Sequence, residues 1–518
     1  MTLKKQNAVK ENNKDNMAEL NDLLLGSSLE ENIALLRNIF TNDETLVFRR
    51  FQNRNIKAVK CCAVYFNGMI DPQIVNKDII QPVLSSDLKD GIDIHNLPEE
   101  LQYKVIASGN VNLENQLDQI VSSILYGNTL LLIENCEKAL IISSNGWETR
   151  AITEPESEKV VRGPREGLTE SIIMNITMIR RRIKDPDLKL KFREIGSKTH
   201  TRVCICYIEN VASENILKEL EKRLDQIDID GIIDSGYIQE LIRDAPFSPF
   251  ETVGHTEKPD VVAAKLLEGR IAIISDCSPS VLTVPYIMIE NSQSNEDYYN
   301  NFIYSSFNRF LRTISFVLAV SVPAVYLSIV TFHQEMLPTP LVLSISASKQ
   351  GVPFPSFFSL LVMLLIFDLL REAATRMPTL IGQAVNIVGT LVLGQAAVEA
   401  KLVSAPVIIV TALSGILTLM NLKLIGAVIM IRFLFLILSS ILGIYGYIFG
   451  VIAISLHLLS IRSFGVPYML NVTTLKGHNW QDTFIRAPWW SMKLRPKIIG
   501  AKNLVRQRTK KTGGKKTG

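Results

Sequence analysis

The apolar residues of this chain are concentrated in one region, and this uneven distribution constrains the fold more than any other feature. Residues 1–300 carry charged side chains every few positions, whereas residues 314–461 are mostly apolar. The 518 residues are too many for one hydrophobic core and suffice for about three ordinary domains. We therefore expect a soluble α/β region followed by a polytopic α-helical membrane domain.

The soluble region is expected to lie in the cytosol. The first 20 residues contain no apolar stretch of the kind found in a signal peptide, and residues 1–28 are predicted to be a disordered tail. The cysteines fall in this region without a CxxC spacing, which favours reduced, buried thiols over a metal site. They are Cys61, Cys62, Cys136, Cys204, Cys206 and Cys277.

Two segments of the soluble region, 59–142 and 202–284, resemble each other at a constant separation. KCCAVYFNG (60–68) corresponds to RVCICYIEN (202–210), and Gly127 corresponds to Gly269 at the same offset. This constant offset predicts two similar α/β units, each with a strand, helices and a glycine turn into a hairpin. The predicted subdomains are 29–152 and 153–300, with a helix within 163–186 linking the two copies.

No pattern of catalytic residues is visible in the soluble region. It has no Gly-rich phosphate loop, no GxSxG motif and few histidines, so we expect neither an enzyme nor a cofactor or metal site. The basic run Arg180–Arg182 could contact phosphates, although such runs more often form a solvated helix face or lie near anionic lipid.

The membrane domain is predicted to occupy residues 301–465 and to contain about four to six spans. Arg309 and Arg312 place the start of the first span in the cytosol, and the basic tail 466–518 places the C-terminus there, which favours an even number of spans. From Arg486 to Gly518 there are 11 Lys or Arg and no Asp or Glu. The predicted spans are 314–332, 354–370, 380–398, 402–420, 424–442 and 443–461.

The third predicted span differs from the others by its polar side chains. Gln383, Asn386 and Thr390 are spaced by three and four residues, so they share one helix face. Amides and glycines can hold helices together, or such a face can line a water-filled path, and the sequence leaves both possibilities open. A charged cluster before this span is either an interfacial ion-pair network or an electrostatic ring at a gate. The candidate pore or gate residues are Gln383, Asn386, Thr390, Gln395, Glu399, Asp368, Arg371, Glu372 and Arg376.

Seven motifs occur in an order that resembles the A subunits of spore germinant receptors, the GerA family of endospore-forming Firmicutes. The resemblance covers roughly residues 30–495. Its motifs are GPREGLTES (163–171), SPF (248–250), KPDVVAAKLLEGRIAII (258–274), PTPLVLSI (338–345), GVPFP (351–355), LLREAATRMP (369–378) and IGQAVNIVGTLVLGQAAVEAKLVSAP (381–406). The chain departs from the family pattern at Ser359, where a carboxylate is common, at Gln395, where a glutamate is common, and at Cys277, where a glycine is common.

The resemblance implies a multi-pass protein of the spore inner membrane with both termini in the cytosol. In this family the A subunit works with a transporter-like B subunit, thought to carry the nutrient site, and with a lipoprotein C subunit. A subunits are thought to form an oligomeric ring around an ion path. The resemblance therefore implies a nutrient-gated ion channel or signal transducer, with no role in nucleic-acid binding.

Other functions remain open from the sequence alone. One is a related A-type subunit of the dipicolinate-release system, which neighbouring genes would distinguish from a receptor. Another is a secondary transporter, which would call for a repeat inside the membrane half, and we find none there. A membrane scaffold for enzymes is a third, and it would need no polar face on the third span.

Overall fold

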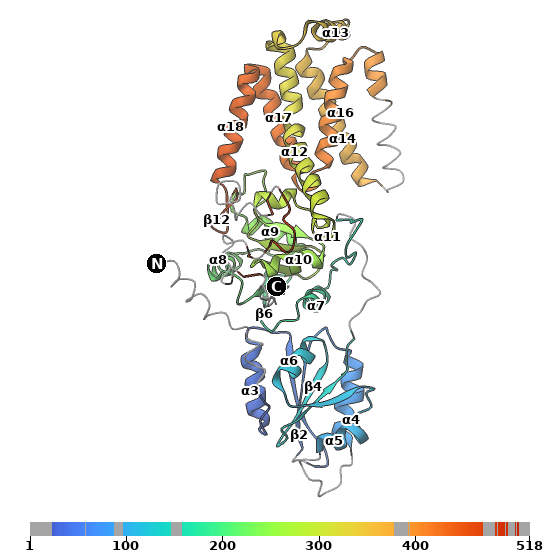
Figure 1. The fold of residues 1–518 in the computed structure, drawn as a ribbon, viewed down its shortest axis with the longest axis vertical. Helices are drawn as coiled ribbons and strands as arrows, with labels where there is room; N and C mark the ends of the chain where they lie inside the picture. The colour runs from blue at the N-terminus through green and yellow to red at the C-terminus, as the bar shows by residue number, and fades with distance from the viewer. Residues whose placement is uncertain are drawn as a thin grey trace, which may run out of the picture. The chain divides into compact units, whose positions relative to one another are not determined.

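We describe the protein from a computed structural model, which places residues 23–56, 59–86, 97–146, 158–377, 392 and 394–469. Toward the C-terminus it describes 482–483, 485–492, 494–495, 503 and 505–506. Contacts divide the chain into two compact units (Figure 1). The α/β unit comprises Met1–Arg243, Val253–Pro285 and Met492–Gly518, and the helical unit comprises Asp244–Thr252 and Tyr286–Ser491.

The first sheet of the α/β unit has five antiparallel strands in the order β1-β2-β4-β5-β3. Successive side chains of a strand point to opposite faces of the sheet, so two separate clusters form. Cys62 and Val64 of β2 pack with helices α3 and α6, whereas Cys61 and Ala63 pack on the other face with η1 and α4. The strands are β1 (Leu46–Gln52), β2 (Lys60–Phe66), β3 (Val111–Glu114), β4 (Thr129–Ile133) and β5 (Ala139–Ile142).

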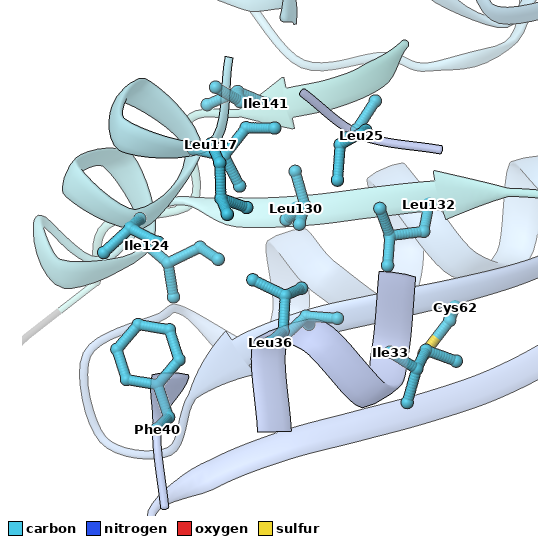
Figure 2. Packing of buried hydrophobic residues seen from close by; sticks show 14 of the residues in the cluster. Leu25, Ile33, Leu36, Phe40, Cys62, Leu117, Ile124, Leu130, Leu132 and Ile141 are labelled. Atoms are coloured by element: carbon cyan, nitrogen blue, oxygen red, sulfur yellow. The ribbon is translucent and has the colours of Figure 1, made fainter. Parts of the chain in front are cut away.

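Helices cover both faces of this sheet, which explains why its central strands consist almost wholly of apolar residues. Figure 2 shows Leu36 of α3 and Ile124 of α6 gathered against Leu130 of β4. The helices are α3 (Leu29–Ile39), the π-helical η1 (Ile74–Ile80) and η3 (Leu101–Val105), α4 (Gln81–Ser85), α5 (Leu97–Glu100) and α6 (Leu117–Leu125).

The second sheet is also antiparallel and has the order β6-β7-β9-β10-β8. Its strands are β6 (Leu188–Ile195), β7 (Thr201–Ile208), β8 (Gly254–Thr256), β9 (Ile271–Ser275) and β10 (Val281–Val284). Its helices are α7 (Ile172–Arg182), α8 (Glu214–Asp225), α9 (Ser235–Ile242) and α10 (Pro259–Leu267).

The two sheets confirm the predicted pair of similar α/β units. Each strand of the first sheet has a counterpart at the same place in the second, and β1 and β6 begin at the offset that the sequence comparison found. The register agrees as well, because Cys62 pairs with Leu132 in one sheet and Cys204 pairs with Ile274 in the other. Gly127 and Gly269 both have φ 98°, a value that favours glycine, before the following strand.

Each copy extends beyond the segments 59–142 and 202–284 that the sequence comparison aligned. Helix α7, within 163–186, is the first helix of the second copy and corresponds to α3 of the first. Both helices follow a serine N-cap residue, Ser28 or Ser171, and carry a buried asparagine four residues later, Asn32 or Asn175. The two helices are separated by one residue more than the paired strands β1 and β6, and this shift hid the correspondence.

The two asparagines hold the chain that enters each helix through equivalent pairs of hydrogen bonds, which we call the clamp. The Asn32 amide accepts a hydrogen bond from the Gly26 nitrogen at 2.9 Å and donates one to the Gly26 carbonyl at 2.7 Å. The Asn175 amide makes the same pair of bonds with Thr169, at 2.7 and 2.6 Å. Both side chains are buried, so their loss would leave backbone polar groups without partners.

We therefore predict that Asn32→Ala and Asn175→Ala each destabilise the protein by about 1–3 kcal/mol, the cost of buried polar groups left unpaired. Thermal unfolding of the detergent-solubilised full chain would show the effect as a lowered midpoint. Asn38→Ala, on the exposed side of α3, is the matched control and should leave the midpoint nearly unchanged. Equal midpoints for all three variants would contradict the clamp.

A buried ion pair joins the two copies within the α/β unit. The Arg180 guanidinium of α7 contacts the Asp43 carboxylate of the first copy and lies 4.1 Å from the centre of the Phe66 ring. Backbone hydrogen bonds between Glu44 or Asn42 and Leu190 of β6 lie beside it. Arg180 is therefore a buried structural residue, and Arg182 pairs with Glu166 at 2.5 Å, so these members of the basic run bind carboxylates of the same chain.

Burial determines the chemistry of the cysteines. Five are buried, and burial raises the pKa of Cys61 and Cys206 to about 12 and that of Cys62 to about 11. Cys277 is exposed, in a turn where its φ is 63°, a value that favours glycine.

We predict that one thiol per chain reacts rapidly with a maleimide at pH 7.5 in the native protein, because a thiolate is the nucleophile and the buried thiols stay protonated. Intact-mass spectrometry should show a single adduct that disappears in Cys277→Ser, and all six cysteines should react after denaturation. Two or more rapid adducts on the native chain would show that the α/β cores are open.

Among its described residues, the helical unit contains two helices that are long and apolar enough to cross a membrane, Phe302–Phe332 and Leu422–Leu442. The shorter Ala405–Leu419 and Ile444–Ser460 are also apolar. Within the described residues the unit comprises η4 (Met288–Ser292), α11 (Glu296–Tyr299), α12 (Phe302–Phe332), η5 (Gln334–Met336), α13 (Thr339–Lys349), α14 (Ser356–Arg376), a helix at 394–399, α16 (Ala405–Leu419), η6 (Leu422–Leu424), α17 (Ile425–Leu442), α18 (Ile444–Ser460), β11 (Arg462–Ser463) and β12 (Val466–Pro467).

Helix α12 is the centre of this unit and packs against α16, α17 and α18. Its 31 residues correspond to about 46 Å at ~1.5 Å per residue, which exceeds a hydrocarbon layer of about 30 Å. Gly443, with φ 61°, separates α17 from α18. Most of the third predicted span, 380–398, lies outside the described residues.

Candidate functional site

The candidate pore or gate residues fall into three groups. Gln383, Asn386 and Thr390 lie outside the described residues, and Gln395 and Glu399 are exposed on the helix at 394–399. The other four lie on α14 and form two separate ion pairs. In the exposed one, Arg376 contacts Glu372 at 2.7 Å, one helical turn apart.

Asp368 belongs to the buried ion pair of the helical unit. Its Oδ2 atom lies 2.5 Å from Nη2 of Arg432 on α17, and its Oδ1 atom lies 3.3 Å from Nη1 of Arg371. The Arg432 side chain is 1% exposed and that of Asp368 is 13% exposed. An unpaired buried charge costs several kcal/mol, so each residue of this pair makes the other tolerable in an apolar bundle.

Arg432 also joins two further helices to this pair. Its Nη1 atom donates to Ser414 Oγ on α16 at 3.2 Å, and that hydroxyl donates to the Ala319 carbonyl on α12 at 2.7 Å. One guanidinium thus connects α17, α14, α16 and α12. Sequence reasoning did not identify this role, although Arg432 is the one charge in the apolar run 424–461 and a charge there calls for a carboxylate on a neighbouring helix.

A second buried arginine fixes the beginning of α12. Arg309 Nη1 lies 2.8 Å from Asp482 Oδ1, and its Nε atom lies 3.3 Å from Asp297 Oδ2. The Tyr298 hydroxyl donates to the other Asp482 oxygen at 2.7 Å. This network holds residues 482 and 483 of the C-terminal segment against α11 and α12.

The segment 244–252 belongs to the helical unit, although the chain on both sides of it belongs to the α/β unit. Phe250 is fully buried in a cluster that includes Tyr286, Val428 and Leu458. Ser248 Oγ lies 2.9 Å from His457 Nε2 near the end of α18. The segment therefore enters the apolar core of the helical unit through the aromatic ring of Phe250.

The ends of this segment are hydrogen-bonded to one turn of the helical unit. The Phe464 nitrogen donates to Asp244 Oδ2 at 2.8 Å, and Ser463 Oγ donates to the Thr252 carbonyl at 2.7 Å. The Asp244 nitrogen donates to Thr252 Oγ1 at 3.1 Å, which closes the loop. The segment is thus fixed at both ends and at its centre, and sequence periodicity gives no sign of this because the segment is neither helix nor strand.

A cavity of about 560 Å³ lies in the α/β unit where α3 faces the second copy. Its lining combines apolar residues, such as Leu35 and Leu117, with the charged Glu31, Lys189 and Glu209. The Lys189 ammonium already lies 3.4 Å from the Glu209 carboxylate. No group of three or more metal-ligating side chains occurs among the described residues.

Comparison with known proteins identifies the family. The chain matches the family model described as Bacillus/Clostridium GerA spore germination protein over residues 34–498. The chain belongs to the GerA spore germination family. It is 39% identical over 487 residues to spore germination protein KA of Bacillus subtilis, covering 94% of this chain and 89% of that protein.

Further GerA relatives agree with this assignment. Spore germination protein A1 of Bacillus subtilis is 36% identical over 442 residues, covering 85% of this chain and 89% of the relative. Spore germination protein GerLA of Bacillus cereus is 34% identical, and the match covers 86% of this chain and 90% of the relative. Among solved structures, the N-terminal domain of the A subunit of the Bacillus megaterium spore germinant receptor GerK3 is 34% identical, covering 50% of this chain and 96% of that domain with a TM-score of 0.41.

The buried ring of Phe250 anchors segment 244–252 in the helical unit of this GerA protein, and this anchor leads to a prediction. Phe250→Ala should destabilise the helical unit by about 3–5 kcal/mol, since a fully buried ring is replaced by a cavity. Phe247 of the same segment is 100% exposed and provides the matched control Phe247→Ala. Limited proteolysis of membrane extracts should show faster cleavage of the first variant alone, and equal cleavage rates would contradict the anchor.

Proposed function

We propose that this protein is the A subunit of a spore nutrient germinant receptor, acting as a nutrient-gated ion channel or signal transducer in the spore inner membrane. The observation that carries the proposal is the GerA family match over residues 34–498, together with relatives named spore germination proteins at 30–39% identity. The two long apolar helices support a place in the membrane.

The proposed ion path is the polar face of the third predicted span. The spacing of Gln383, Asn386 and Thr390 predicts that they share a helix face, and one such face can surround a path only when several copies come together. The proposal therefore includes a homo-oligomer, which works with receptor B and C subunits. Binding of nutrient elsewhere would need a coupling free energy of only about 1–3 kcal/mol to change opening about 5–150-fold.

The buried pair of Asp368 and Arg432 supports a role for α14 beside this path. The pair holds α14, the helix that precedes the third predicted span in the sequence, to α17 and through Arg432 to α16 and α12. The segment 244–252 supports a transducing role for the α/β unit. Phe250 fixes this segment in the helical unit, whereas residues 243 and 253 on either side of it belong to the α/β unit, so the chain would transmit a displacement of those two residues to the helical unit. Both features suit a subunit in which soluble and helical parts change state together.

The test is potassium release from spores that carry Asn386→Leu or Thr390→Leu. We expect normal amounts of the subunit by immunoblot, with nutrient-triggered release either lost or spontaneous, because a polar group facing the ion path has been replaced by an apolar one. Val388→Leu, off the polar face of the same span, is the matched control and should behave as the unaltered receptor.

Unchanged release in Asn386→Leu and Thr390→Leu would contradict the ion path along this face. Normal potassium release with a defect confined to dipicolinate release would favour an A-type subunit of the dipicolinate-release system instead.

A further inference from the structure

Helix α13, Thr339–Lys349, is apolar but packs into no core of the protein. It has no charged residue before Lys349, and none of its residues is buried. Leu343 is 65% exposed, and Leu341, on another side of the helix, is also exposed. Burying a leucine side chain is worth about 1.5–3 kcal/mol, so this helix leaves a substantial stabilisation unused unless another surface covers it.

An isolated helix of this length also needs support. Its 11 residues are fewer than the roughly 12–15 at which helices become even marginally stable in water. Ser348 Oγ donates to the Ile345 carbonyl at 2.7 Å, so this hydroxyl is satisfied within the helix. The helix therefore calls for an apolar surrounding rather than for water.

The chain connections place α13 at the end of the bundle. Residues 333–338 join it to the end of α12, and residues 350–355 join it to the start of α14. Six residues span at most about 20 Å, so α13 stays close to the level at which both apolar helices end. Figure 1 shows it lying across the end of the helical unit rather than along α12.

Two ammonium groups lie at the C-terminal end of α13. Lys349 is its last residue, and Lys401 lies against Gly351, where an added Cβ would come within 3.0 Å of Lys401 Cδ and 3.4 Å of its Nζ. Lysines at this place can contact phosphate groups while the apolar residues lie deeper. The combination fits the boundary between lipid headgroups and acyl chains, where interfacial helices place their apolar side chains about 5–10 Å deep.

We infer that α13 is an interfacial lipid-binding helix, which lies in the leaflet at which α12 ends and α14 begins. Leu343 enters the acyl region, and Lys349 and Lys401 contact anionic phospholipid headgroups. This inference rests on the membrane placement in the proposed function. It assigns to α13 a role outside the ion path: it fixes the depth of the α12–α14 connection in the bilayer.

The test uses an environment-sensitive NBD label on the full chain in vesicles of phosphatidylcholine and phosphatidylglycerol. Leu343→Cys in a Cys277→Ser background carries the label, since the remaining cysteines are buried. We expect blue-shifted emission that doxyl lipids quench and that aqueous iodide does not. Glu335→Cys in η5 is the water-exposed control, and Ile409→Cys, exposed on α16, is the control for the bilayer interior.

Each other outcome overturns the inference in a different way. Iodide quenching at position 343 as strong as at 335 would place α13 in water. Quenching at 343 by neither agent would mean that protein, such as a second copy of this chain, covers the helix. If doxyl lipids also fail to quench the label at 409, the membrane placement itself fails, and with it the proposed function.

The headgroup contact has its own readout. We expect the NBD emission at 343 to be more blue-shifted in vesicles with phosphatidylglycerol than in vesicles without it, and Lys349→Gln with Lys401→Gln should remove this difference. Persistence of that difference would contradict the assignment of these two lysines.

Discussion

Three buried guanidinium groups determine which parts of this chain must lie together. An arginine side chain keeps its charge in proteins, so burying one without a carboxylate costs several kcal/mol. Arg180, Arg309 and Arg432 are the largest fully buried side chains among the described residues, and each contacts an aspartate that is distant in sequence. The first joins the two α/β copies, the second joins α12 to the C-terminal segment, and the third joins α14 to α17.

These pairs restrict how the protein can change state. An apolar contact can slide by a fraction of an ångström at little cost, but a buried ion pair is either made or broken. A rearrangement that separates one of these pairs would leave a buried charge without its partner, so the pairs favour movement of the joined helices as one body. Segment 244–252 adds a fixed attachment, because Phe250 is buried at its centre and its two ends are bonded to one turn.

The fold class was predictable because its signals are local and repeated. Apolar strands, a charged helix face and a constant offset between two segments suffice to predict two similar α/β units and an apolar helical region. The correspondence of α3 and α7 escaped because one extra residue breaks that offset, although Ser28 and Asn32 recur as Ser171 and Asn175. The partner of Arg432 escaped for a different reason: periodicity shows which residues share a helix face, but not which faces of different helices meet. The burial of Phe250 has no periodic signal at all, since its segment is irregular.

The buried pair of Asp368 and Arg432 holds the helices of the proposed channel or transducer together, and a charge exchange tests this role most directly. Potassium release and subunit amount would be measured in spores with Asp368→Arg, with Arg432→Asp and with both changes. The account predicts that each single change abolishes the response or the subunit, because a buried charge loses its partner, and that the double change restores both at least in part. The exposed pair of Glu372 and Arg376, exchanged in the same way, should have little effect. Normal responses from the single variants, or a double variant that is present but as inactive as either single one, would contradict the account.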